Sequence, residues 1–113
     1  MKERQVGSIF IVTPKGYLTG GKETDDLEQA IKKLGEADAK HLIINLAEAQ
    51  HLNSTALGVL ISAHSNFVRR GGQMKLCCVD KRIENIFVIT KLSLVFDVYA
   101  TEEQAIASFA VKE

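Results

Sequence analysis

The sequence predicts an α/β domain in which helices pack against a mixed, mostly parallel β-sheet. Strand-like apolar runs alternate along the chain with segments of helical periodicity, and glycines or the single proline separate them. The 113 residues, 46% of them hydrophobic, suffice for one buried core and include no linker-like segment. We therefore expect residues 1–113 to form a single domain, with an N-terminal hairpin and about four helices layered on the sheet.

The first elements are expected to be two short strands joined by a turn. Residues 8–13 are β-branched and aromatic, which favours a strand, and residues 14–16 include the proline and glycine of a turn. Residues 17–19 can then return as a second strand. This pattern predicts a hairpin between residues 8–13 and 17–19.

The first helix is expected to follow the acidic cluster at residues 24–26 and to end near Gly35. Its apolar positions recur at helical spacing, at Leu27, Ala30, Ile31 and Leu34. The run at residues 41–46 is almost unbroken in its apolar character, which is typical of a strand covered on both faces. We expect this strand to lie centrally in the sheet.

The second helix is expected between Ser54 and Arg70, with Gly71 and Gly72 ending it. Its predicted apolar stripe consists of Leu57, Leu60, Ile61, His64 and Val68. Beyond it we expect a strand at residues 74–79, a helical segment at 83–89, a strand at 94–99 and a helix capped by residues 101–104. Helices between successive strands favour parallel pairing.

Charge and hydropathy exclude several classes of function. Fourteen basic side chains balance fourteen acidic ones, so no long-range field favours nucleic acid or an anionic membrane as a partner. No stretch approaches the roughly 20 apolar residues of a membrane span, and the charged N-terminus leads into no long apolar run. We expect a cytoplasmic protein without membrane insertion; the oligomeric state stays open.

The two cysteines predict neither a disulfide nor a metal site. Cys77 and Cys78 are neighbours in a strand-like run, whose alternation would place their side chains on opposite faces as reduced thiols. Together with His41 they match no zinc-ligand spacing. We therefore expect no metal and no cofactor.

An enzymatic site is not predicted either. Ser54, His64 and Asp80 include the residue types of a catalytic triad, but the sequence contains no nucleophile-elbow pattern. His64 falls on the helical stripe and is expected to be a core or boundary residue, whereas His51 is expected to be a solvated loop residue. The chain is thus expected to bind partners rather than catalyse a reaction.

The most informative place is the passage from the central strand into the second helix. Asn53, Ser54 and Thr55 are all helix-capping residue types, and we expect Ser54 to be the cap. A phosphate on Ser54 or Thr55 would face free N–H groups and the positive end of the helix dipole. Further along the helix, Ala56, Val59 and Ala63 lie off the main stripe, where they either form a small exposed partner-binding face or pack against another helix.

The segment Leu52-Asn53-Ser54-Thr55-Ala56-Leu57-Gly58-Val59 resembles the phosphorylation segment of STAS domains in bacterial anti-sigma-factor antagonists. The resemblance extends over nearly the whole chain. Residues 17–20 resemble the family's early turn, residues 42–46 its central strand, and residues 71–74 and 90–92 its later landmarks. It implies a STAS-like arrangement of the α/β domain.

The resemblance also implies a non-enzymatic role in signal transduction and transcription regulation. Thr55 matches the residue that a partner kinase phosphorylates, and Ser54 is the second-choice acceptor. The implied partner is an anti-sigma factor or serine-protein kinase that binds the dephosphorylated form, with a phosphatase as a further candidate partner. The implied partner-binding residues are Asn53, Ser54, Thr55, Ala56, Val59 and Ala63.

Two departures from the family pattern favour alternatives. Asn53 occupies a position where aspartate is usual, and Ala56 one where glycine is usual. Both favour a second hypothesis, a STAS binding subunit of a larger transport or signalling complex that is not phosphorylated. A third hypothesis, a sensor of a small anion or nucleotide, rests only on the anion affinity of a helix N-terminus.

Overall fold

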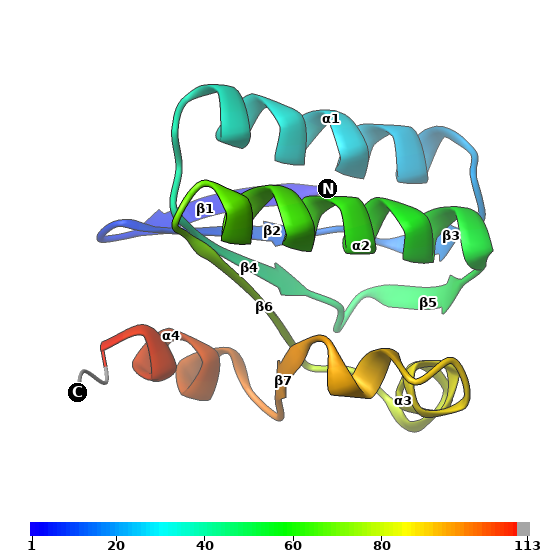
Figure 1. Ribbon diagram of the computed structural model, residues 1–113. Helices are drawn as coiled ribbons and strands as arrows, with labels where there is room; N and C mark the ends of the chain where they lie inside the picture. The colour runs from blue at the N-terminus through cyan, green and yellow to red at the C-terminus, as the bar shows by residue number, and fades with distance from the viewer. Residues whose placement is uncertain (111–113) are drawn as a thin grey trace.

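Residues 1–110 are described by the computed structural model, and within them the strand-like and helical patterns form seven strands and four α-helices (Figure 1). The elements are β1 (Lys2–Val6), β2 (Ile9–Thr13), β3 (Gly16–Leu18), α1 (Lys22–Glu36), β4 (His41–Asn45), β5 (Ala49–Leu52), α2 (Ser54–Arg69), β6 (Gln73–Cys77), α3 (Lys81–Ile89), the 3-10 turn η1 (Leu92–Leu94), β7 (Asp97–Tyr99) and α4 (Glu102–Ala110).

The main sheet has five strands in the order β1-β2-β4-β6-β7. Only β1 and β2 pair antiparallel, and each remaining neighbouring pair is parallel, so the sheet is mixed and mostly parallel as predicted. The apolar run at residues 41–46 forms the central strand β4. Leu42 and Ile44 belong to one core cluster and Ile43 to the other, and all three are 0% exposed. The strand is therefore covered on both faces, as expected.

The N-terminal hairpin exists, but it is formed by other strands than predicted. β1 pairs with β2 around Gly7, whose φ of 59° suits the tight turn. The predicted return strand, β3, instead pairs in parallel with β5 in a separate two-stranded sheet. Every residue of β1 is exposed, and its charged side chains suit an edge strand. Apolar patterning cannot reveal such a strand, because it contributes nothing to the core.

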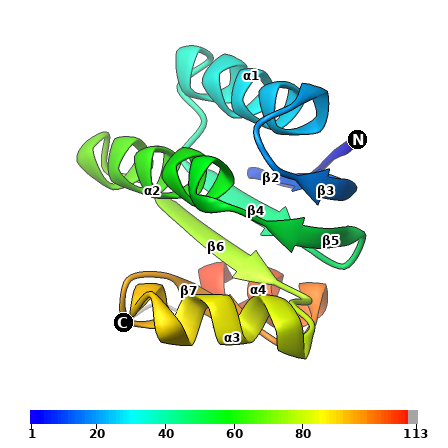
Figure 2. The same cartoon turned by 90° about the vertical axis from the view of Figure 1, so that its right-hand side faces the viewer.

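The helices are divided between the two faces of the sheet. Figure 1 shows α1 and α2 side by side on one face and α4 on the other, while α3 lies beyond β5 and β6. Figure 2 shows the same layering from the side. The apolar face predicted for α1 is confirmed, since Leu27, Ala30 and Ile31 are buried and Leu34 packs against the same core. Ala105 and Phe109 of α4 pack against the opposite core cluster.

The stripe predicted for α2 is partly wrong. The buried residues of α2 are Ala56, Leu57, Leu60, Ala63 and Phe67. Ile61 and Val68 from the predicted stripe are 40% and 51% exposed. The reason is that α2 packs on two neighbours at once, β6 and α1, so its small alanines fill the second contact. His64 is half-buried and meets the Phe96 ring edge-on at 5.5 Å, which is the boundary role expected of it.

The segment predicted as a strand at residues 94–99 is only partly extended. It begins within the 3-10 turn η1 (Leu92–Leu94), and β7 covers only Asp97–Tyr99. Lys91, which precedes the turn, has a left-handed φ of 65°. Phe96 points into the core and lies 5.8 Å from the Phe87 ring, which fixes the turn against α3.

The expected placement of the two cysteines on opposite faces is also wrong. β6 ends at Cys77, and Cys78 adopts a left-handed φ of 65°, which breaks the alternation of the strand. The two sulfur atoms consequently lie 3.4 Å apart. Both are free thiols.

Candidate functional site

The small β3–β5 sheet brings two helix starts together. In this parallel pair Leu18 is opposite Leu52, so the chain leaves both strands at the same end. After β3 it passes through residues 19–21 into α1, and after β5 it passes through Asn53 into α2. The N–H of Asn53 donates to the Leu18 carbonyl at 3.1 Å, which extends the pairing by one more bond. Sequence reasoning missed β5, so it could not foresee this convergence.

Asn53, and not Ser54 as predicted, caps α2. Its Oδ1 accepts from the Ala56 N–H at 3.1 Å, and its backbone is extended as a cap requires. Its Nδ2 donates to the Thr19 carbonyl at 2.9 Å. The amide therefore accepts from the helix N–H through its oxygen and donates to the neighbouring loop through its nitrogen, so one side chain joins the two segments.

Thr55 lies in the first turn of α2 and faces the loop before α1. A Cβ built on Gly20 would lie 3.6 Å from Thr55 Cγ2 and 3.7 Å from its Oγ1, so the glycine and the threonine are in contact across the two loops. Gly20 has a φ of 98°, and its N–H donates to Thr24 Oγ1 at 2.9 Å. The residue at position 20 thus needs glycine for its backbone conformation.

The hydroxyls of Ser54 and Thr55 are accessible. Both residues are exposed, and within the described residues 1–110 neither hydroxyl has a hydrogen-bond partner. α2 carries no acidic residue in its first turn, and the N-cap of α1, Gly21, provides no side-chain cap. The start of α2 therefore offers free N–H groups in a turn without carboxylates, an environment that favours negative charge, whereas the first turn of α1 carries Glu23 and Asp25.

The other residues expected at a partner-binding face are placed differently. Ala56 and Ala63 are 0% and 6% exposed, which favours the packing alternative for both. Val59 is half-buried and lines the groove between α1 and α2 together with Ala63. The accessible surface at this end of α2 thus belongs to Asn53, Ser54 and Thr55.

Two exposed aromatic rings lie beside this surface. Tyr17 is 62% exposed on β3. His51 is exposed as expected, but it lies on β5 and not in a loop. The two residues are opposite one another in the parallel pair, with ring centroids 6.5 Å apart. Tyr17 was not singled out for the site because the sequence placed it in a hairpin. The residues that sequence reasoning omitted are thus Tyr17, Thr19, Gly20 and Thr24, all near the early turn that the family resemblance did locate.

The described residues were also compared with the geometry of metal sites and of membrane-spanning helices. Residues 1–110 contain no group of three or more His, Cys, Asp and Glu side chains placed to hold a metal ion. No helix among them is long and apolar enough to cross a bilayer.

Comparison with known proteins assigns the family. The STAS domain pattern matches residues 1–105 of this chain. The chain belongs to the STAS domain family. An anti-sigma F factor antagonist from Paenibacillus polymyxa is 23% identical over 106 residues, which cover 91% of this chain and 88% of that protein. STAS antagonists of this type are non-enzymatic regulatory proteins.

Solved structures share the fold. A crystal structure assigned as an anti-sigma factor antagonist from Thermotoga maritima superposes with a TM-score of 0.88, at 17% identity, over 95% of this chain and 92% of the other. The phosphorylated form of the Bacillus cell fate determinant SpoIIAA superposes with a TM-score of 0.76, at 17% identity, over 96% and 97%. The STAS domain of a SulP transporter from Vibrio cholerae reaches 0.77, at 15% identity, over 95% and 84%. This STAS chain therefore has the fold of both antagonists and transporter domains.

Proposed function

We propose that this STAS chain is an anti-sigma-factor antagonist whose partner binding is switched by phosphorylation of Thr55. The partner is an anti-sigma factor that is also a serine-protein kinase, and a phosphatase would reset the switch. We place this exchange in the cytoplasm and assign it to one domain formed by residues 1–113. The observation that carries the proposal is the exposed Thr55 hydroxyl, in the first turn of α2 and in contact range of Gly20.

Electrostatics support Thr55 as the acceptor. A phosphate there would add about −1.5 to −2 charges beside the first-turn N–H groups of α2 that the Asn53 cap leaves free, and these groups would stabilise it locally. The same charge would lie on the surface formed by Asn53, Ser54 and Thr55, where it would prevent close contact with the partner. Ser54 remains the second-choice acceptor. It is equally exposed and is not occupied as a cap, contrary to our expectation from the sequence.

The likeness to relatives supports the partner class. A relative named as an anti-sigma F factor antagonist aligns with 91% of the chain, and a structure of the same fold is known in a phosphorylated form. We assign direct partner contact to Asn53, Ser54, Thr55 and the accessible part of Val59. Ala56 and Ala63 support this surface from beneath, because both are buried.

One observation favours a second function, a STAS module that binds its partner without a phosphorylation switch. Asn53 supplies a neutral amide engaged at both ends, where a carboxylate is usual in the switching antagonists. The transporter STAS domain with a TM-score of 0.77 gives a precedent for this fold within a larger protein. In that case Thr55 would serve as an uncharged contact residue.

Phosphate analysis of the protein recovered from its own cells separates the two functions. Intact-mass and phosphopeptide measurements are made on cells grown with and without stress, and the wild type is compared with Thr55→Ala and Ser54→Ala. A condition-dependent phosphate that disappears only in Thr55→Ala agrees with the switch. A phosphate that disappears only in Ser54→Ala transfers the acceptor role to Ser54, and no phosphate under any condition favours the fixed module.

A further inference from the structure

Cys77 and Cys78 form a close thiol pair where β6 ends. Their sulfur atoms are 3.4 Å apart, with the Cys78 thiol donating to Cys77 Sγ. The contact depends on the left-handed conformation of Cys78, because a continued strand would direct the two side chains to opposite faces. A positive φ is uncommon for a residue other than glycine, asparagine or aspartate, so the surrounding structure must impose it.

The backbone on both sides of the pair is held by the sheet. The Cys77 carbonyl accepts from the Leu46 N–H at 3.0 Å, and the Cys78 N–H donates to the Tyr99 carbonyl at 3.0 Å. These bonds attach the two residues to the chain after β4 and to β7. These backbone hydrogen bonds fix the main chain of both cysteines. The closeness of the two sulfur atoms therefore depends on the backbone as well as on the side-chain rotamers.

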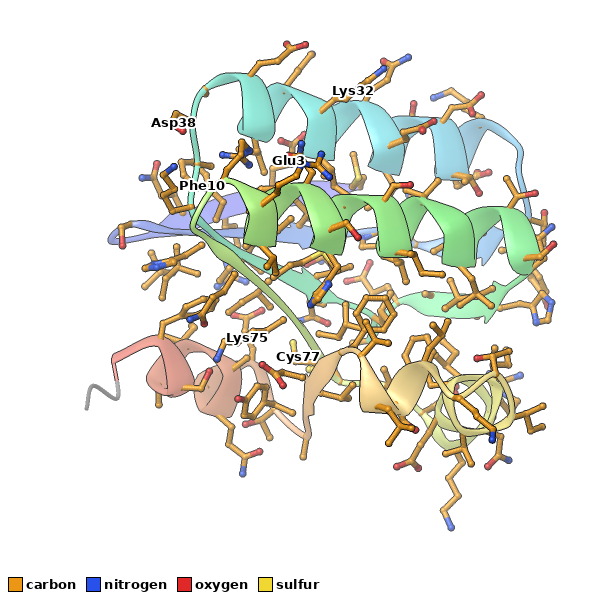
Figure 3. The ribbon with its side chains drawn as sticks, in the orientation of Figure 1. Glu3, Phe10, Lys32, Asp38, Lys75 and Cys77 are labelled. Atoms are coloured by element: carbon orange, nitrogen blue, oxygen red, sulfur yellow. The ribbon has the colours of Figure 1, made fainter. Side chains whose placement is uncertain are left out.

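The two thiols differ in access. Cys77 is 0% exposed and packs with Ala105 and Phe109 beneath α4, and Figure 3 shows it between β6 and that helix. Cys78 is only half-buried. Burial raises the pKa of the Cys77 thiol, with a further contribution from the neighbouring Cys78. A dissolved oxidant therefore reaches Cys78 first, whereas the buried Cys77 is accessible only to Cys78.

We propose that Cys77 and Cys78 are an oxidation site at which a hydroperoxide forms a disulfide between the two neighbours. The Cys78 thiolate attacks one oxygen of hydrogen peroxide, the O–O bond breaks, and hydroxide leaves, which gives a sulfenic acid on Cys78. The Cys77 sulfur then attacks the Cys78 sulfur. An S–S bond forms, the S–O bond breaks, and the hydroxyl leaves as water with the proton of Cys77. Two thiols are oxidised, and one peroxide is reduced to two molecules of water.

The disulfide would be easily reversed. Adjacent Cα atoms are about 3.8 Å apart, which is shorter than the roughly 4.4–6.8 Å of relaxed disulfides. The resulting strain makes the bond readily reducible by cellular thiols, as suits a sensor rather than a structural crosslink. Closing the ring would also bring the two sulfur atoms from 3.4 Å to about 2.05 Å, and both cysteines pack in the cluster that includes Ala105 and Phe109. Oxidation is therefore coupled to the packing of α4 on the sheet.

The test uses the full reduced chain and hydrogen peroxide. After treatment, free thiols are alkylated with N-ethylmaleimide under denaturing conditions and the intact mass is measured. The expected product is a monomer lighter by two hydrogen atoms, with neither thiol alkylated and both recovered after dithiothreitol. We also expect a lower thermal midpoint for the oxidised chain than for the reduced one.

Single variants identify the order of the steps. Cys77→Ser should accumulate a sulfenic acid on Cys78 that dimedone traps, whereas Cys78→Ser should react with peroxide at least tenfold more slowly than Cys77→Ser. The proposal is overturned if the wild type gives sulfinic acid on Cys78, a dimer linked through cysteine, or two thiols that remain fully alkylated. Each of these outcomes is measured on the wild type, so the result stands even if a variant fails to fold.

Discussion

Asn53 Nδ2 donates to the Thr19 carbonyl at 2.9 Å, although the two residues lie 34 positions apart in the chain. The same side chain caps α2 through its Oδ1. One amide thus fixes the position of the loop before α1 relative to the first turn of α2. Thr55 lies in that turn and contacts Gly20 of that loop. The geometry around the proposed phosphorylation site depends on this residue.

Two substitutions of Asn53 should distinguish how much each of its two hydrogen bonds contributes to stability. Asn53→Ala removes the cap and the bond to Thr19 and is expected to lower the free energy of unfolding by about 1–2 kcal/mol, measured by urea denaturation. Asn53→Asp keeps the acceptor for the helix but cannot donate to Thr19, so most of the stability should remain. In both variants, hydrogen exchange at the Gly20 amide, which donates to Thr24 Oγ1, should be faster than in the wild type.

The matched control is Ser54→Ala, one position along. Because Ser54 is exposed and does not cap the helix, this change should alter stability by no more than about 0.5 kcal/mol. A larger loss for Ser54→Ala than for Asn53→Ala would mean that Ser54 is the cap, and the account of the site would be wrong.

Two glycines should respond oppositely to alanine. A Cβ on Gly72 would collide with the Lys40 backbone carbonyl, where the Gln73 N–H donates to the same oxygen at 2.7 Å. Gly72→Ala must push the start of β6 away from β4, and we expect it to cost about 1–3 kcal/mol. A Cβ on Gly58 meets nothing within 4 Å, so Gly58→Ala in α2 should add about 0.5–1 kcal/mol. Thermal or urea unfolding measures both; equal effects would contradict the close packing at Gly72.

The ion pair between the edge strand and the last helix predicts a dependence on pH. Arg4 donates to Glu102 at 2.6 Å, and Asn45 Nδ2 donates to the same carboxylate at 2.8 Å. Hydrogen bonding to Arg4 lowers the pKa of Glu102 below its ordinary value of 4.5, although burial opposes the shift. A lowered pKa in the folded state means that this contribution to stability is complete above the unfolded pKa and is lost as the pH falls through the folded one.

Glu102→Gln should therefore be less stable than the wild type at pH 7, and the difference should diminish as the solution is acidified below the ordinary carboxyl pKa. Urea denaturation at a series of pH values measures this difference. Glu103→Gln, a neighbouring and exposed carboxylate without a hydrogen-bond partner in residues 1–110, serves as the control and should show little effect. A pH-independent difference for Glu102→Gln would rule out the ion pair as its cause.

The sequence predicts the elements that contribute to the core better than those that do not. The apolar run of β4 and the face of α1 are visible because burial dictates their residue types. β1 is not predicted because all its residues are exposed, so no apolar pattern marks it. Backbone pairing with β2 holds it in place instead. β5 escapes as well, since Gln50 and His51 are exposed and only its two end residues are buried.

At the site, the residue types indicate a helix start but not how its neighbours converge. Asn53, Ser54 and Thr55 are all capping types, and propensity alone cannot choose among them. The choice is made by the Leu18 and Thr19 carbonyls, which engage the backbone and side chain of Asn53. Those partners lie at the end of β3 and in the residue that follows it, and the pairing of β3 with β5 depends on tertiary contacts. The burial of Ala56 and Ala63 likewise depends on α1 packing against α2.

The most direct test of the central claim uses the purified chain, a serine-kinase anti-sigma factor from the same organism and Mg-ATP. Binding is measured by calorimetry before and after phosphorylation, for the wild type, Thr55→Ala, Thr55→Glu and Thr55→Ser. We predict that the wild type and Thr55→Ser bind until they gain one phosphate at position 55, that Thr55→Ala binds throughout, and that Thr55→Glu binds at least tenfold more weakly. Equal binding by Thr55→Ala, Thr55→Glu and the kinase-treated wild type would contradict the switch and leave a fixed binding module.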